Sequence, residues 1–409
     1  MHLLLSDKIV WLLFLGFILT IFYIRSHPHY ATPWQQVFQQ PIAMIAGVMI
    51  AVYAVIGLLD CIHFETALSL ESVLDKLIGA LNSHEETSYT APFAVVFNAD
   101  HPVSVSRVVM KGCLWGVISF LPIVVLFMYR PRRQRGFHSN RIAWKTGLLT
   151  TAVLWISAAI LIALSAHYHI FGTNQIGQDM FYQTLKSVRT GLLIGTLTTL
   201  FMLPFALFFG LVAGYFGGVV DDAIQYLYTT LSSIPGVLLI TAVILVLEVT
   251  ITNHPALFSN YADRADVRLL ALCAILGLTS WASLCRFLRA ETLKLREQDF
   301  VIASITMGAR KISIIISHIL PNVMHIVIIT IVLDFSGLVL AEAVLAYVGV
   351  GVDPTTPSWG NMINTSRLEL ARDPIVWWPL TAALSMMFFL VLSANVFADT
   401  VRDAFDPRS

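Results

Sequence analysis

Nine apolar segments, each long enough to cross a lipid bilayer, restrict the folds open to this chain. A spanning helix needs about 20 mostly apolar residues to cross roughly 30 Å of hydrocarbon. We predict spans near residues 9–24, 42–60, 112–129, 146–166, 190–214, 223–249, 267–287, 323–345 and 377–398. The runs are continuous, without the apolar and polar alternation of barrel strands, and backbone groups in lipid must be paired within their own segment. The sequence therefore predicts an all-α polytopic membrane protein.

Composition agrees with a membrane protein and excludes other classes. Of 409 residues, 57% are hydrophobic and 12% charged, a balance that a water-soluble domain would hardly keep in solution. The formal net charge is zero, which gives no reason to expect a nucleic-acid partner. The sequence contains neither the phosphate-binding pattern GxxxxGK followed by Ser or Thr nor the zinc pattern HExxH. We predict no catalytic site, no metal site and no cofactor.

Four cysteines form no metal-binding spacing. Cys273 and Cys285 fall in one region of apolar sequence and are expected to pack as small apolar residues. Cys61 and Cys113 flank the loop between the second and third spans. A disulfide between them is one possibility, because that loop is expected outside the cell.

Lys and Arg orient the spans. The loop between the third and fourth spans is the most basic in the chain and predicts a cytoplasmic position. Its cations are Arg130, Arg132, Arg133, Arg135, Arg141 and Lys145. Alternation then puts Met1 and the acidic loop 60–111 outside, and the C-terminus inside. Residues 9–24 also fit the apolar region of a signal peptide, but no small-x-small cleavage site follows, so we expect an uncleaved anchor.

The polar segment Arg289–Asn322, between the seventh and eighth spans, carries the strongest functional signal. Its cations hold it in the cytoplasm, and the small residues Ala303, Ser304 and Gly308 leave room for another protein to approach. It reads as a docking surface and not as a catalytic site. An amphipathic helix without a partner is the competing interpretation.

This segment resembles the EAA loop of ABC importer permeases, whose short coupling helix sits in a groove of an ATPase subunit. The agreement rests on Gly308 and on HILPN at 318–322, which ends as in the dipeptide and oligopeptide branch. Ile302 stands where the family has an acidic residue and Ser304 where it has a second alanine, so the docking chemistry does not carry over in detail. Within the coupling loop 288–322, the resemblance assigns ATPase coupling to Asp299, Ala303, Ser304, Gly308, Ala309, Leu320 and Pro321.

Further motifs of the same branch follow in order. HIFGTNQIGQD at 169–179 resembles an outer-loop motif, with Asn174 and Gln178 replacing two charged residues and Asp179 retained. GYFGGVVD at 214–221 resembles a turn motif, in which paired glycines end one helix and acidic residues begin the next. Pro235, inside the sixth predicted span, is expected to kink it beside the pathway or merely for packing.

The most specific outer motif is AEAVLAYVGVG followed by PTTPSWGNM, which contains Glu342, Trp359 and Asn361. The resemblance covers about 165–409 and implies a six-helix type I ABC importer permease core. We divide the chain into an N-terminal extension of about three spans with an external loop (1–129), a basic linker (130–145) and the core (146–409). The extension has no counterpart in the family core, and an accessory interaction module is one possible role for it.

Asp334 lies about 13 residues beyond Pro321, roughly 20 Å along a helix and close to the middle of the membrane. A carboxylate there costs a few kcal/mol and faces water or a partner helix, so Asp334 is a candidate pathway residue, a structural hydrogen bond being the alternative. Glu248 and Glu342 lie nearer the outer ends, where a solvated position is less costly.

The resemblance implies a transport subunit of an ATP-driven importer in the bacterial inner membrane. Its implied partners are a homologous second permease, two ATP-binding cassette ATPases and an external substrate-binding protein. Peptides, nickel chelates and other small solutes are all cargoes of this branch. The rival hypothesis is a self-contained secondary transporter or channel that uses Asp334 for ion coupling.

Overall fold

The computed structural model describes residues 4–26, 28–65, 70–78, 87–96, 104–128, 143–254 and 261–405. Within these ranges nine helices are long and apolar enough to cross a membrane, one for each predicted span. The all-α polytopic fold is therefore confirmed. The basic cluster 130–142, the acidic residues Glu85, Glu86 and Asp100, and Arg408 lie outside the described residues.

The N-terminal part is helical on both sides of a small region that contains short strands. Its helices are α1 (Leu5–Ser26), α2 (Pro28–Gln39), α3 (Pro41–Asp60), α4 (Val73–Leu77), α6 (Val105–Met128) and α7 (Trp144–Ser165). Two short antiparallel sheets, which the sequence did not predict, join β1 (His63–Glu65) to β2 (Leu70–Ser72) and β3 (Ala94–Val95) to β4 (Tyr168–His169). The region between α3 and α6, which we predicted to be an external loop, thus contains short elements of regular structure among its described residues.

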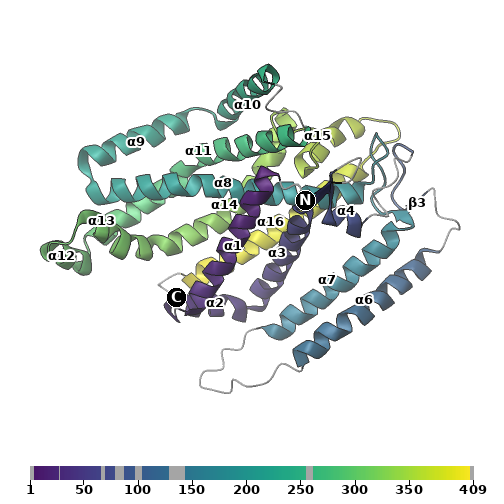
Figure 1. Ribbon diagram of the computed structural model, residues 1–409, viewed down its shortest axis with the longest axis horizontal. Helices are drawn as coiled ribbons and strands as arrows, with labels where there is room; N and C mark the ends of the chain where they lie inside the picture. Colours follow the sequence, from purple (N-terminus) through teal and green to yellow (C-terminus); the bar gives the residue numbers. More distant parts are fainter. Residues whose placement is uncertain are drawn as a thin grey trace. The chain divides into compact units, whose positions relative to one another are not determined.

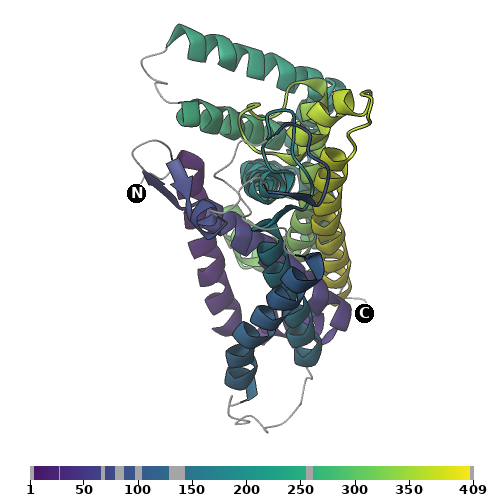
Figure 2. The same ribbon diagram turned by 90° about the vertical axis from the view of Figure 1, so that its right-hand side faces the viewer.

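Helices α6 and α7 lie side by side in both views (Figures 1 and 2). A Cβ atom at Gly112 would come within 2.9 Å of the Ile160 Cα, and one at Gly116 within 3.1 Å of the Ile156 Cα. Small residues four apart therefore allow the two backbones to approach closely, as is common between helices in lipid.

The C-terminal part begins with the longest helix, α8 (Met180–Phe216). It continues through α9 (Gly218–Ser233), α10 (Gly236–Asn253), α11 (Tyr261–Arg296), α12 (Asp299–Thr306), α13 (Lys311–Ile314), the π-helical turn η1 (Ile315–Ile319), α14 (Leu320–Val348), α15 (Trp359–Glu369) and α16 (Trp378–Phe405). The prediction that residues 223–249, the sixth span, form one kinked helix is wrong. Ile234 and Pro235 adopt extended backbone angles and separate α9 from α10, because Pro235 has no N–H to continue the first helix.

The chain forms two compact units. The first comprises Met1–Leu3, Asp7–Gly191 and Pro357–Ala404, and the second Leu4–Ser6, Leu192–Thr356 and Phe405–Ser409. In the first unit, Leu74 and Val108 from the N-terminal extension share one apolar core with Phe181 of α8. The second has a core that includes Trp281, Leu288, Val301 and Ile314. Contacts within the first unit therefore cross residue 129.

All four cysteines are free thiols, so Cys61 and Cys113 form no disulfide in this structure. Cys61 is buried at the end of α3, whereas Cys113 is exposed on α6. Burial raises the pKa of the Cys61 thiol to about 12, and the thiol stays protonated at neutral pH. Cys273 and Cys285 are buried in α11, as expected of packing residues.

Candidate functional site: a docking segment and a helix strap

The docking segment, residues 298–311, forms a short exposed helix with a defined end. Gln298 has extended angles before α12 begins at Asp299, whose carboxylate lies in the first turn and favours the helix start. At the other end Gly308 adopts a φ of +83°, and the Ala309 N–H donates to the Ser304 carbonyl at 3.1 Å. Glycine reaches this left-handed conformation without steric cost.

The predicted coupling residues divide between two faces of this segment. Asp299, Ala303, Gly308 and Ala309 are exposed, as is Pro321 at the start of α14, whereas Leu320 is half-buried. Ser304 differs from the expectation of an open surface, since it is only 6% exposed. Its hydroxyl donates to the Phe300 carbonyl at 2.9 Å and lies 3.3 Å from the His318 Nε2.

Large apolar side chains occupy the exposed face of the docking segment and continue beyond it. Ile302 and Ile305 are each 47% exposed, Met307 is 79% exposed and Ile312 on α13 is 69% exposed. Residues 298–310 lie between α11 and the candidate span that begins at Lys311, outside both apolar helices. Contiguous apolar surface of this kind marks a site for a protein or a membrane surface.

Helix α9 is fastened to α11 by two contacts, which we call the strap. The Asp221 carboxylate accepts two hydrogen bonds from the Arg289 guanidinium, one from Nε and one from Nη2 at 2.6 Å. These bonds hold the pKa of Asp221 below its usual range, against the opposing effect of burial. The Arg286 guanidinium lies 5.7 Å from the centroid of the Tyr228 ring, a cation–π distance. The strap thus joins two helices through two points on each.

The end of α8 is also held against α11. A Cβ at Gly210 would lie 2.7 Å from the Leu288 Cβ, and one at Gly214 would lie 2.5 Å from the Thr292 Cβ. One residue beyond, the Arg296 Nη1 donates to the Tyr215 carbonyl at 3.2 Å. The ends of α8 and α11 therefore pack too closely for any residue larger than glycine at those positions.

The candidate pathway residues differ in their surroundings. Pro235 lies at the break between α9 and α10. Asp334 is half-buried on α14, next along the helix face to Thr330 and Gly337, and a Cβ added at Gly337 would meet open space. Glu342 is only 3% exposed, so the expectation of a solvated position for it is wrong. Glu248 is paired with the Arg268 Nη1 at 2.6 Å.

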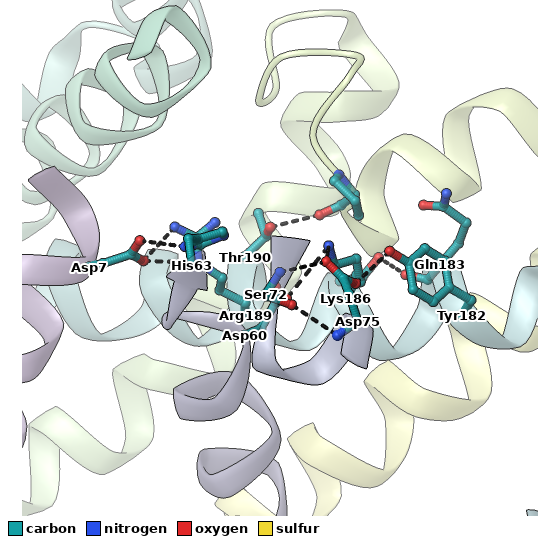
Figure 3. Close-up of polar contacts among 12 residues, drawn as sticks. Asp7, Asp60, His63, Ser72, Asp75, Tyr182, Gln183, Lys186, Arg189 and Thr190 are labelled. Atoms are coloured by element: carbon teal, nitrogen blue, oxygen red, sulfur yellow. Dashed lines mark hydrogen bonds and ion pairs between the residues drawn. The ribbon is translucent and has the colours of Figure 1, made fainter. Parts of the chain in front are cut away.

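A buried polar cluster in the first unit joins the extension to the start of α8 (Figure 3). The Asp7 carboxylate, fully buried on α1, accepts hydrogen bonds from the Arg189 Nε at 3.1 Å and Nη2 at 2.6 Å. The His63 Nδ1 lies 3.2 Å from the other Asp7 oxygen. Both hydrogen bonds from Arg189 reach one Asp7 oxygen, and together they offset part of the cost of burying the two charges.

A second part of the polar cluster surrounds Asp75 of α4, whose partners Tyr182 and Lys186 precede Arg189 on α8 (Figure 3). Its carboxylate accepts from the Tyr182 hydroxyl at 2.6 Å, the Lys186 Nζ at 2.9 Å and the Ser72 N–H at 2.8 Å. Burial alone would raise the pKa of Asp75, but Lys186 and the other donors outweigh it and lower the pKa. Asp60 lies 3.7 Å from the same Lys186 Nζ.

The outer motif residues also make defined contacts in the first unit. Asp179 begins α8 by accepting from the Phe181 N–H at 2.8 Å, and it lies 2.7 Å from the His169 Nδ1. Trp359 is 1% exposed and donates from Nε1 to the Thr184 carbonyl at 3.1 Å. The Asn361 N–H donates to the Ser358 hydroxyl, which caps α15.

The sequence analysis predicted neither the pairing of Asp7 with Arg189 nor that of Asp221 with Arg289. It had noted Asp221 as a helix start and Arg289 as a cytoplasmic cation, without joining them. Asp7, Lys186 and Arg189 drew no attention, although each lies within a few residues of a predicted span boundary. Charges at span boundaries are ordinary in membrane proteins, and only the fold reveals which of them meet.

Comparison with known proteins gives one family. The family described as binding-protein-dependent transport system inner membrane component matches residues 206–409. The chain is 30% identical over 241 residues to the dipeptide transport system permease protein DppC of Lactococcus lactis subsp. cremoris (strain MG1363). That alignment covers 59% of this chain and 64% of the Lactococcus protein, so the chain spans a little under two thirds of that relative's length.

Two oligopeptide transport system permease proteins OppC are similar over more of their length. The protein of Bacillus subtilis (strain 168) is 27% identical over 66% of this chain and 87% of its own length. That of Mycobacterium bovis (strain ATCC BAA-935 / AF2122/97) is 30% identical over 59% of this chain and 76% of its own length.

Proposed function

The chain belongs to the family of binding-protein-dependent transport system inner membrane components, and on that premise we propose that it is a membrane-spanning subunit of an ATP-driven importer. Its role is transport and not catalysis. We further propose that its cargo is a dipeptide or an oligopeptide, since its relatives are named as dipeptide and oligopeptide transport system permeases.

The exposed docking segment is the observation that carries this proposal. A helix of eight residues with Ile302 and Ile305 exposed, followed directly by exposed Met307, offers a compact apolar surface outside the spans. An ATPase subunit covers this surface and transmits its motion through it. Ala303 and Gly308 permit close approach, and Ser304 supports the helix from within through the His318 contact.

A complete importer requires further subunits. The proposed assembly contains this chain, a homologous second permease, two ATPases and an external substrate-binding protein. The docking segment and the C-terminus face the cytoplasm, and the N-terminus and the polar cluster face outward. Lipid covers the apolar faces of the spans, such as that of α1, where Leu12 is 69% and Phe22 63% exposed.

Asp334 is proposed to line the pathway within the membrane. Its carboxylate is half-buried on a helix face shared with Thr330 and Gly337, which leaves space beside it. A carboxylate at such depth is retained for a function or a specific partner. It would attract the protonated amine of a peptide. The same position would serve ion coupling in a secondary transporter, which is the second candidate function.

Site-specific cross-linking and reconstitution test the proposal. Cys113 is the exposed native thiol among the described residues and is first changed to Ser. A cysteine is then placed at Met307, or as a control at Tyr261, which is 84% exposed at the opposite end of α11. We expect Met307→Cys to cross-link to an ATPase subunit and Tyr261→Cys not to.

Uptake into vesicles separates the two candidate functions. Vesicles that hold the chain with its second permease and both ATPases, with the substrate-binding protein supplied outside, should accumulate peptide only when ATP is supplied inside. Accumulation by the chain alone, driven by an ion gradient and lost in Asp334→Asn, would overturn the importer and favour the secondary transporter.

A further inference from the structure

The strap suggests how motion of the docking segment reaches α9, a helix outside that segment. We propose that Asp221 and Arg289 are positioning residues for coupling, and that they make α9 move together with α11 and α12. This inference rests on the proposed importer function. It concerns α9, the helix that the structure separates from the predicted sixth span.

Geometry makes the strap stiff. The Asp221–Arg289 contact is bidentate, so it fixes the orientation of the two side chains as well as their distance. The Tyr228–Arg286 contact lies seven residues along α9 and three along α11 from the first. Two separate points of attachment prevent α9 from pivoting about either one. Buried Ile224, between these points, belongs to the same apolar core as Leu288.

Only a short connection separates the strap from the helix of the docking segment. Arg289 and Arg296 lie on the last two turns of α11, and only Glu297 and Gln298 separate α11 from α12. The Arg296 contact to the Tyr215 carbonyl and the close packing at Gly210 and Gly214 hold the end of α8 in the same body. A displacement of α12 therefore carries the ends of α8 and α11 and all of α9 with it.

The group of helices that we expect to move together ends at the C-terminus of α9. Ile234 and Pro235 interrupt the helical backbone there, with ψ values of 127° and 115°. Such a break bends more readily than a continuous helix, because Pro235 has no N–H with which to continue the hydrogen bonds of α9. The strap therefore turns motion of the docking segment into a change of angle between α9 and α10 at Pro235.

Distances between spin labels test the rigid body without the ATPases. Labels are attached at Tyr226 on α9, 76% exposed, and Met307 after α12, 79% exposed, in the purified full chain with Cys113 changed to Ser. We expect a narrow distance distribution that broadens in Asp221→Asn. The control Lys294→Gln removes an exposed ion pair to Glu291 within α11, at 3.0 Å, and should leave the distribution narrow. An equally narrow distribution in Asp221→Asn would overturn the strap.

The complete transporter tests the consequence for coupling. In Asp221→Asn we expect uptake per ATP hydrolysed to fall about 5-fold or more, while Lys294→Gln keeps the normal ratio. The exchange Asp221→Arg with Arg289→Asp should restore much of the ratio, which a general loss of folded protein would not allow. A normal ratio in folded Asp221→Asn overturns the inference, even if ATP-driven uptake itself is intact. If instead ATP drives no uptake in the unaltered protein, the proposed function fails, and the label distances still decide whether the strap is rigid.

Discussion

The polar cluster and the strap both rest on an aspartate paired with an arginine, yet they differ in burial. In the polar cluster the Asp7 side chain is 0% and the Arg189 side chain 11% exposed, whereas in the strap Asp221 is 12% and Arg289 24% exposed. When one partner of a deeply buried pair is removed, water cannot solvate the remaining charge. At the edge of solvent, water can take the place of the missing partner. We therefore expect the loss of one partner to cost more in the first unit than in the second.

Their neighbours differ in the same sense. Around Arg189, several acidic and basic groups from α1, α3, α4 and α8 meet in one buried cluster, so each charge depends on the others. Arg289, by contrast, lies on α11, which only Glu297 and Gln298 separate from α12 of the docking segment. A buried network of charged groups resists rearrangement of its helices, whereas exposed apolar surface marks a site for a partner.

Removing one arginine from each pair should give the largest effect. Arg189→Met leaves the Asp7 carboxylate buried without its partner, and we expect the free energy of unfolding to fall by about 3–5 kcal/mol. Arg289→Met should lose only about 1–2 kcal/mol, because water can reach Asp221. Denaturant unfolding of both variants in detergent measures the difference. Equal losses would remove the distinction between the two regions.

A bulky residue in the docking segment should impair coupling and leave the fold intact. In Gly308→Leu we expect ATP-dependent uptake to fall about tenfold or more, because an obstructed contact in an interface costs about 2 kcal/mol or more. Gly349, at the end of α14, has a φ of +88° and equally open surroundings, so Gly349→Leu is a control for backbone strain. Vesicle uptake that is alike in both variants would argue against docking at Gly308.

Packing between Trp359 and α8 offers a test of the first unit that involves no charge. A Cβ at Gly191 would lie 2.9 Å from the Trp359 Cζ3, and Gly191→Ala should therefore lower the free energy of unfolding by about 1–3 kcal/mol. Adding Trp359→Phe should recover part of that loss, because the smaller ring leaves room for the methyl group. A double variant less stable than the sum of the two changes would contradict this arrangement.

Acid should weaken the Asp75 contacts by a smaller amount. The pKa of Asp75 is lowered in the folded protein, so its contribution is fully present above the unfolded value of about 3.9 and is lost as the pH falls through the folded value. Unfolding followed between about pH 6 and 3 should show a decline below about pH 4 that is shallower in Asp75→Asn. Identical pH profiles would mean that Asp75 does not stabilise the folded state as an anion.

The apolar runs allowed the spans to be predicted well, because a helix in lipid needs no distant partner for its backbone. Nine predicted spans correspond to nine apolar helices among the described residues. Boundaries were less predictable. Helix α8 begins at Met180, ten residues before its predicted span, because Asp179 caps it outside the apolar run. Pro235 was recognised, but a proline alone does not reveal whether a helix bends or breaks.

Site residues were predictable one at a time and not as groups. Gly308 and Asp299 stand where the motif suggested, at the end and start of a short helix, because turn and cap preferences act within a few residues. Ser304 lies on the buried face of that helix and contacts His318, fourteen residues away, which could not be foreseen.

By itself the sequence determined that this chain is a polytopic helical membrane protein with a polar segment between its seventh and eighth spans, since apolar length and local turn chemistry suffice for both. Only the tertiary structure decided that Asp7 meets Arg189 across 182 positions of sequence and that Asp221 meets Arg289 across 68. The reason is physical: pairing between distant charges depends on which helices pack together, and that packing is a property of the whole fold.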